Sequence, residues 1–164
     1  MTGSVAQDGA VPEPVFDKEV DLIVAGAGAG GMTAALVAAL EGLDVLLCEK
    51  TSQVGGTTAT SAGTLWIPGN RQSITAGYSD SAEQAEAYLD SLITGETNRH
   101  LRTAFLRTGP DAIDYLAAKT DVRFMPCGMH PDYRSNRPGA AVSGRAIIPE
   151  PFDGRLLGRR TAPE

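Results

Sequence analysis

Three glycines and one glutamate have the types and spacing of a site for a diphosphate and its ribose. Gly26, Gly28 and Gly31 fit the pattern G-x-G-x-x-G, and Glu49 follows the next apolar segment. In such a motif the first glycine allows a tight turn, the second lets a pyrophosphate approach the backbone, and the third lets a helix pack closely. Free N–H groups of the first helical turn attract phosphate, and a carboxylate accepts hydrogen bonds from ribose hydroxyls. The residues expected around the phosphates are Gly26, Ala27, Gly28, Ala29, Gly30 and Gly31.

The segments around this motif are those that a dinucleotide site needs. An apolar strand is predicted at 20–25, a helix at 32–40, and a second strand at 44–48, which ends in Glu49-Lys50. A glycine-rich turn without a ligand is the alternative, but the strand, the helix and the acidic residue meet the conditions that make this motif specific. The predicted fold class is α/β: a partial Rossmann-like, doubly wound domain with appended helices and loops.

Only two strong strands are visible, whereas a doubly wound sheet needs several. We therefore expect the front part of a longer protein, or else a truncated gene product. Residues 51–63, 70–78 and 126–145 read as loops, and 65–69 as a short apolar segment. Ser81 and Gln84 form a capping box, and Gly109-Pro110 interrupts the helical pattern that follows. Helices are expected at 80–94, 98–107 and 110–119, and short strands at 122–125 and 147–148.

Composition excludes several classes of protein. The chain has 164 residues and a net charge of −6, which argues against a general nucleic-acid surface. Cys48 and Cys127 have neither metal-site nor disulfide spacing. Cys48 is expected inside a buried strand and Cys127 in a partly exposed loop. Residues 1–18 read as a disordered tail without a secretory signal, and no apolar run approaches the ~20 residues of a membrane span. We expect a cytoplasmic protein.

The segment after the second strand resembles the flavoprotein subunits of the fumarate reductase and succinate dehydrogenase superfamily. The resemblance implies FAD as cofactor and makes residues 19–164 the N-terminal part of its binding domain. It also implies that a glycine- and hydroxyl-rich loop runs past the pyrophosphate toward the isoalloxazine ring. A flexible linker is the alternative, although a linker would not need Trp66-Ile67-Pro68 directly after it. The residues that carry the resemblance, and to which it assigns cofactor contacts, are Glu49, Lys50, Gly55, Gly56, Thr57, Thr58, Ser61, Ala62, Gly63 and Thr64.

The second half is similar to the 3-ketosteroid delta-1-dehydrogenase branch of that superfamily. The similarity runs from about residue 18 to 158 and lies in Tyr88-Leu89, Gly109-Pro110, Pro131-Asp132-Tyr133, Ser143-Gly144-Arg145 and Pro149-Glu150-Pro151-Phe152. It implies an oxidoreductase acting on CH–CH groups, which 1,2-dehydrogenates a 3-ketosteroid. A proton leaves the carbon beside the ketone, and a hydride passes to flavin N5. The implied partners are a steroid or another enone or ketone, and an external electron acceptor.

Tyr133 occupies the position of the family's early active-site tyrosine, so the resemblance implies that it assists a basic tyrosine from a later segment. Arg134 follows where the family often has a second tyrosine. An ordinary half-buried loop tyrosine is the alternative. Asp132 is expected to form a turn and His100 to lie on a solvated face, whereas His130, a single histidine near Tyr133 without a partner, is weak evidence for a substrate cleft there. Two rival functions remain open: a fumarate-reductase-like flavoenzyme that reduces an unsaturated acid, and an inactive nucleotide-binding remnant.

Overall fold

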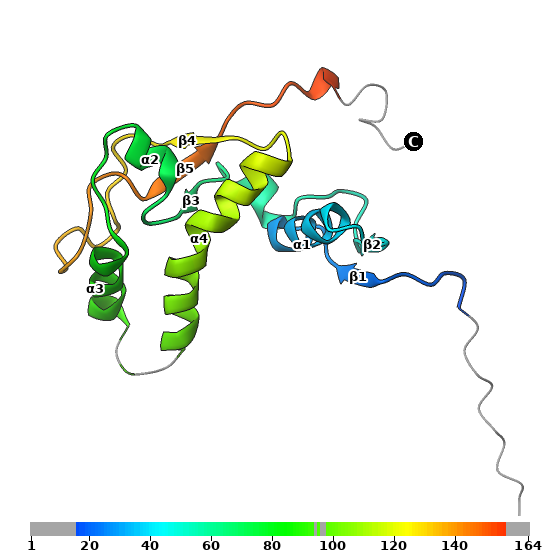
Figure 1. The fold of residues 1–164 in the computed structure, drawn as a ribbon, viewed down its shortest axis with the longest axis horizontal. Coiled ribbons are helices and arrows are strands. Elements are labelled where there is room, and N and C mark those ends of the chain that lie inside the picture. Colours follow the sequence, from blue (N-terminus) through cyan, green and yellow to red (C-terminus); the bar gives the residue numbers. More distant parts are fainter. Residues whose placement is uncertain (1–15, 94, 96–97, 157–164) are drawn as a thin grey trace, which may run out of the picture. The chain divides into compact units, whose positions relative to one another are not determined.

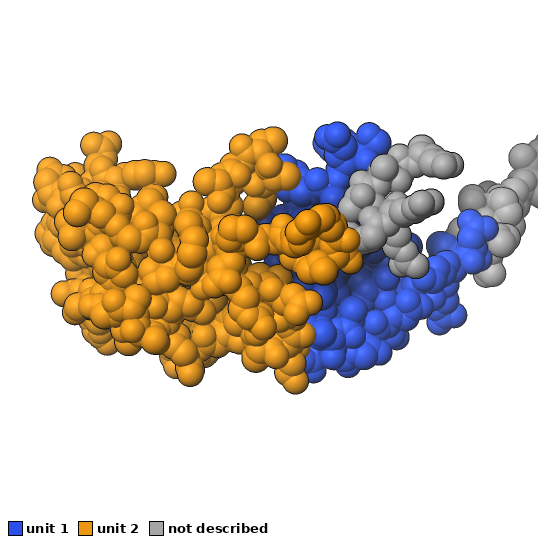
Figure 2. Space-filling view, turned by 90° about the horizontal axis from the view of Figure 1, so that it is seen from above, with its two compact units in different colours: residues 1–56 blue, residues 57–164 orange. Residues whose placement is uncertain are grey.

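The computed structural model describes residues 16–93, 95 and 98–156, so the expected tail at 1–18 lies almost wholly outside the described residues. The chain divides into two compact units, residues 1–56 and residues 57–164, which Figure 2 shows in different colours. Each unit is described by itself below. No described helix is both long enough and apolar enough to cross a lipid bilayer.

The first unit is a strand–helix–strand. Strand β1 (Leu22–Ala25) leads into helix α1 (Ala29–Leu40), and strand β2 (Val45–Cys48) follows (Figure 1). The two strands pair in parallel, with Leu22 opposite Val45 and Ala25 opposite Cys48. This arrangement confirms the predicted strands and helix, although the helix begins three residues before the expected Met32. Because parallel strands run the same way, their carboxyl ends meet at one edge, where the glycine turn and Glu49 lie.

The faces of this unit are only partly covered. Its buried apolar side chains among the described residues are Ala27 and Ala38, whereas Ile23 in β1 is 65% exposed. Cys48 is exposed as well, so its expected burial was wrong. The reason is that β2 has β1 as its one neighbour in the described sheet, and Cys48 is the last residue of β2, so no further strand covers it.

The second unit combines helices with an antiparallel sheet. After a 3₁₀ helix (Gly56–Thr60), it contains β3 (Leu65–Trp66), α2 (Arg71–Thr75), α3 (Ala82–Leu92), α4 (Arg99–Lys119), β4 (Phe124–Pro126) and β5 (Ala146–Pro149). The strands lie in the order β3-β5-β4, with β5 between its two antiparallel partners. Ile67, Ile113 and Ile147 form the buried core, against which Leu65 and Phe124 pack. Strands near 122–125 and 147–148 were predicted and are confirmed.

Two local predictions were wrong. Within 70–78, expected to be loop, the structure has α2, which is capped by Asn70: its side-chain oxygen accepts a hydrogen bond from Ser73 N at 2.8 Å. A helix of five residues is too short to show hydrophobic periodicity. Its N-cap residue, Asn70, is the one local signal of a helix start. The helices expected at 98–107 and 110–119 are one helix, α4, with Pro110 inside it. Leu106 and Ile113 are buried on either side of the proline, and this packing holds the helix together.

Candidate functional site

The glycine turn between β1 and α1 has the geometry that its sequence requires. Gly26 has a φ of 102°, a left-handed conformation that favours glycine, and its N–H donates to Cys48 O at 2.7 Å. A Cβ on Gly31 would collide with the carbonyl oxygen of Gly26. Gly31 therefore lets α1 approach the turn closely, as the motif predicts.

Gly28 is a glycine for which the protein itself gives no steric reason. Its φ is −77°, which any residue adopts, and a Cβ built there would meet nothing within 4 Å. The backbone of Gly55 passes beside it, because Gly55 N donates to Ala27 O at 2.7 Å and the two glycines form an isolated parallel bridge. Open space in front of a bare backbone, beside a second glycine pair, fits a pyrophosphate that approaches closely.

Helix α1 offers the hydrogen-bond donors for such an anion. Its N-cap, Gly28, has no side chain to satisfy the first-turn N–H groups, and no acidic residue lies in that turn. These N–H groups have no partner inside the helix, and the dipole favours negative charge there. The amides of Gly26 and Ala27, by contrast, are bonded to Cys48 O and Glu49. The first-turn N–H groups that remain for an anion are therefore those of Gly30 and Gly31, because the bridge between Gly28 and Gly55 involves the Ala29 amide.

Glu49 stands at the end of β2 and is held by backbone donors. Its Oε2 accepts from Ala27 N at 2.8 Å, and its Oε1 accepts from the amide and the hydroxyl of Thr51 at 3.0 and 3.2 Å. The bond from Ala27 and then that from Thr51 hold the pKa of Glu49 below its ordinary value. Carboxylate oxygens also accept hydrogen bonds from ribose hydroxyls, which is the role that the sequence predicts for Glu49. Glu49 and Lys50 line a hollow of about 460 Å³ with Ala25, Gly26 and Cys48.

A second hollow lies within unit 2 and brings together residues that are far apart in the sequence. Thr57 and Thr58 are exposed in the 3₁₀ helix, and Gly63 has a φ of 66°. One pocket of about 520 Å³ is lined by Tyr133 and by three loop residues for which the sequence predicts cofactor contacts, Ser61, Ala62 and Thr64. The lining of this pocket, mostly apolar, consists of Ser61, Ala62, Thr64, Trp66, Tyr88, Leu89, Leu92, His130, Pro131, Asp132, Tyr133 and Ala146.

Tyr133 lines this pocket and is 96% exposed, more than the half-buried loop residue of the alternative interpretation, and its catalytic role stays a prediction. His130 borders the same pocket and is half-buried. His100 is exposed on α4, also as expected. Among the described residues, no group of three or more His, Cys, Asp or Glu side chains could hold a metal ion.

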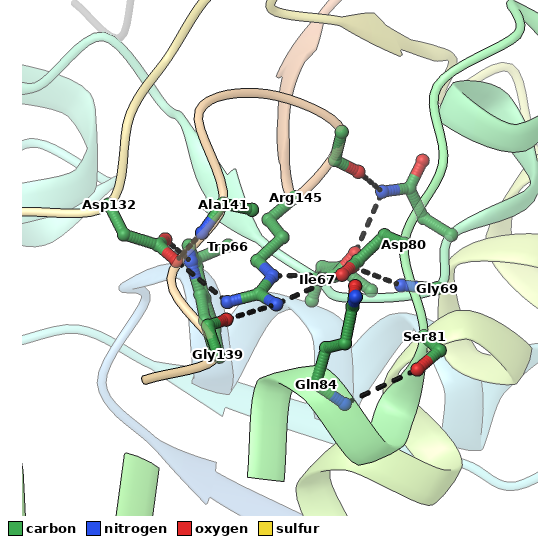
Figure 3. A network of polar contacts seen from close by, with 12 residues as sticks. Trp66, Ile67, Gly69, Asp80, Ser81, Gln84, Asp132, Gly139, Ala141 and Arg145 are labelled. Carbon is green, nitrogen blue, oxygen red and sulfur yellow. Dashed lines mark hydrogen bonds and ion pairs between the residues drawn. The ribbon is translucent and has the colours of Figure 1, made fainter. Parts of the chain in front are cut away.

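The sequence did not reveal the charged cluster beside this pocket. Asp132, expected to form a turn, is buried and pairs with Arg145, which also pairs with Asp80 (Figure 3). The available signal was Arg145 directly before the apolar residues of β5, since a charge at a buried strand end needs a partner. Its partners lie 13 and 65 residues away, and no local pattern could name them.

In a comparison with known proteins, two of the relatives that this chain resembles are both dehydrogenases by name. The chain is 46% identical to the 4-oxocyclohex-2-ene-1-carboxylate 5-dehydrogenase of Sinomonas cyclohexanicum, over 84% of this chain and 23% of that protein. It is 37% identical to the 3-oxosteroid 1-dehydrogenase of Mycobacterium tuberculosis H37Rv, over 86% of this chain and 25% of the relative. The chain thus spans about a quarter of the length of these curated relatives.

A solved structure agrees with these relatives. The crystal structure of 3-ketosteroid delta1-dehydrogenase from Sterolibacterium denitrificans in complex with 1,4-androstadiene-3,17-dione superposes with a TM-score of 0.80. The identity is 39%, over 85% of this chain and 25% of that chain. Residues 21–164 also match the family described as FAD binding domain. The chain therefore belongs to the FAD-binding domain family, and FAD, the cofactor expected from the sequence, is the cofactor that this membership indicates.

Proposed function

We propose that this chain is the cofactor-binding part of an FAD-dependent enzyme that dehydrogenates the CH–CH bond beside a ring ketone, and that its substrate is a 3-ketosteroid. One observation carries the proposal: Tyr133 lines the same pocket as Ser61, Ala62 and Thr64, the loop residues expected to approach the flavin. A tyrosine beside the expected flavin loop is where a proton-transfer group must lie.

The first unit supplies the proposed grip on FAD. Gly28 and the first turn of α1 hold the pyrophosphate, Glu49 accepts from the adenosine ribose, and Gly55-Gly56 lie beside the phosphate turn. This makes β1-α1-β2 the opening unit of a Rossmann-like, doubly wound sheet. When bound, FAD supplies the acceptor for the hydride that leaves the substrate.

The second unit supplies one wall of the proposed substrate cleft. Trp66, Tyr88, Leu89 and Leu92 offer apolar surface to a neutral ring system. The exposed phenol of Tyr133 hydrogen-bonds the group that removes the proton beside the ketone, and so favours the deprotonated form of that group. The electron pair that the proton leaves behind would form the new C=C bond as a hydride left the adjacent carbon for bound FAD, and an external acceptor would then take up the two electrons.

A second candidate substrate is a small cyclic ketone that carries a carboxylate. It is favoured by the 46% identity to a dehydrogenase whose name specifies 4-oxocyclohex-2-ene-1-carboxylate. Both candidates need the same step, loss of two hydrogens from adjacent carbons beside a ring ketone. They differ in charge and in the length of apolar surface that the pocket must cover.

The cytoplasmic location expected from the sequence stays a prediction.

The decisive experiment measures substrate-dependent reduction of an artificial electron-accepting dye by the FAD-loaded full-length protein, which includes the later segment expected to supply the basic tyrosine. A 3-ketosteroid, 4-oxocyclohexanecarboxylate and, with a reduced dye as electron donor, an unsaturated dicarboxylate are compared. We expect turnover with the steroid and a kcat/KM at least tenfold lower with the cyclohexane acid. Preference for the cyclohexane acid would replace the steroid by the second candidate. Turnover of the dicarboxylate alone, or no turnover by protein with full flavin absorbance, would overturn the proposal.

A further inference from the structure

Arg145 lies buried between two carboxylates at the back of the Tyr133 pocket. Its side chain is 1% exposed, and those of Asp80 and Asp132 are each 2% exposed. Arg145 Nε donates to Asp80 Oδ1 at 3.0 Å and Nη1 donates to Asp132 Oδ2 at 2.6 Å, while Nη2 reaches Gly139 O at 2.8 Å (Figure 3). The cluster of Asp80, Arg145 and Asp132 carries a net charge of −1.

Backbone and indole donors compensate this extra negative charge. Asp80 Oδ2 accepts from Gly69 N at 3.1 Å, and Asp132 Oδ1 accepts from Trp66 Nε1 at 2.7 Å. The guanidinium carbon of Arg145 lies 5.6 Å from the centroid of the Trp66 ring and 5.7 Å from that of Tyr88. Both rings also line the pocket. The cluster therefore fixes two aromatic walls of the pocket at once.

The same cluster reaches the backbone on either side of Tyr133. Before it, Asp132 exchanges hydrogen bonds with Ala141: its N–H donates to Ala141 O and its Oδ2 accepts from Ala141 N, both at 2.9 Å. After it, Arg134 N donates to the hydroxyl oxygen of Tyr88 at 3.1 Å. Tyr133 itself is 96% exposed. The two held neighbours therefore fix the backbone of Tyr133 and the direction of its Cα–Cβ bond, although its own ring is not packed.

We propose that Asp80, Arg145 and Asp132, with the hydroxyl of Tyr88, are positioning residues that hold the backbone around Tyr133 so that its phenol points into the pocket. This rests on the proposed function, in which Tyr133 takes part in proton transfer. A buried ion cluster stabilises little compared with apolar side chains of the same shape, but its hydrogen bonds fix directions. A small misplacement of a reacting group lowers the rate steeply. A cluster that holds the backbone of Tyr133 in place should therefore affect kcat.

The test uses Tyr88→Phe and Asp132→Asn, each alone and each combined with Tyr133→Phe. Tyr88→Phe removes only the hydroxyl that accepts from Arg134 N and leaves the ion cluster complete. Asp132→Asn loosens the cluster itself. Asp114→Asn is the matched control, because Asp114 pairs with Arg71 at 2.9 Å in an exposed ion pair outside the pocket. Flavin absorbance checks that each variant is folded and loaded.

The first readout needs no turnover: amide hydrogen exchange in the 164-residue chain. In Tyr88→Phe the amide of Arg134 exchanges faster, while the amide of Ile147 in β5 keeps its protection. The second readout is the steady-state rate of the FAD-loaded full-length protein with the substrate that it turns over. We expect kcat to fall about ten- to a hundredfold in Tyr88→Phe and in Asp132→Asn, with KM changed less than kcat. The control keeps the wild-type kcat.

The double variants separate positioning from simple stabilisation. If the cluster acts through Tyr133, then Tyr88→Phe and Asp132→Asn cause no further loss of kcat once Tyr133 is Phe. Additive losses, or unchanged kcat in both single variants while Tyr133→Phe is slow, would overturn the positioning role. An unchanged kcat in Tyr133→Phe would instead refute the proposed part of Tyr133 in catalysis. Should Asp132→Asn fail to fold, Tyr88→Phe alone still decides.

Discussion

Gly28 and Gly31 belong to one motif but are glycines for different physical reasons. At Gly31 a side chain would strike the carbonyl oxygen of Gly26, so the fold excludes it. At Gly28 the backbone is unstrained and the space in front is open, so no described residue excludes a side chain, and the proposed pyrophosphate would be what excludes it. The two positions therefore separate the stability of the turn from its binding.

We expect Gly28→Val to abolish FAD uptake while the thermal unfolding temperature of the flavin-free chain changes little. Loss of the glycine cap costs the helix about 1 kcal/mol. Gly31→Ala, in contrast, should destabilise the flavin-free chain by several kcal/mol, since backbone must move to admit the methyl group. Flavin absorbance after gel filtration and thermal unfolding by circular dichroism measure the two effects. Equal flavin occupancy in Gly28→Val and wild type would contradict the pyrophosphate assignment.

Glu49 makes the stability of the phosphate turn depend on pH. The hydrogen bonds from Ala27 and Thr51 put its folded-state pKa below its ordinary value. Its contribution is therefore fully present above the ordinary glutamate pKa and disappears as the pH falls through the lowered folded-state pKa. We expect Glu49→Gln to melt below wild type at neutral pH, and the gap to close in acid. Melting temperatures measured from neutral to acid pH check this; a gap of constant size would show that the charge is not responsible.

At the scale of elements, α4 shows tertiary packing overriding a local signal. Pro110 cannot donate a hydrogen bond, and its ring crowds the carbonyl of Leu106, so the sequence favours a break there. The helix continues because Leu106 and Ile113 are both buried, and Ile113 belongs to the core with Ile67 and Ile147. Packing on both sides of residue 110 outweighs one missing hydrogen bond.

Replacing this proline should therefore strengthen the helix. We expect Pro110→Ala to raise the free energy of unfolding by about 1–3 kcal/mol, because it restores the hydrogen bond to Leu106 O and relieves the clash. Denaturant unfolding followed at 222 nm measures the change. A destabilised variant would mean that the ring of Pro110 contributes packing greater than its helix penalty.

For the whole molecule, burial differs sharply between the two units. Unit 2 buries Ile67, Leu106, Ile113 and Ile147, whereas unit 1 buries only alanines among its described apolar side chains and leaves Ile23 exposed. A parallel strand pair is normally covered on both faces. A ligand that binds only the folded form adds about 2.7 kcal/mol at a hundred times its dissociation constant. If unit 1 grips FAD as proposed, we expect the cofactor to be a substantial source of stability for that unit.

The sequence by itself determined the parts whose cause is local. The turn at Gly26, the close approach at Gly31, the parallel strands and the acidic strand end follow from residue types within about thirty positions. The family resemblance, and with it FAD, followed from contiguous motifs and is confirmed by the family match.

Only the tertiary structure decided the charged cluster behind Tyr133, the continuity of α4 and the exposure of Cys48. The physical reason is the same in each case. A buried charge takes whichever opposite charge the fold brings near, a proline is tolerated where distant side chains pack around it, and a strand is buried only where another layer covers it. In all three cases the neighbouring residues are distant in the sequence and come together only in the folded chain, so no local spacing predicts them.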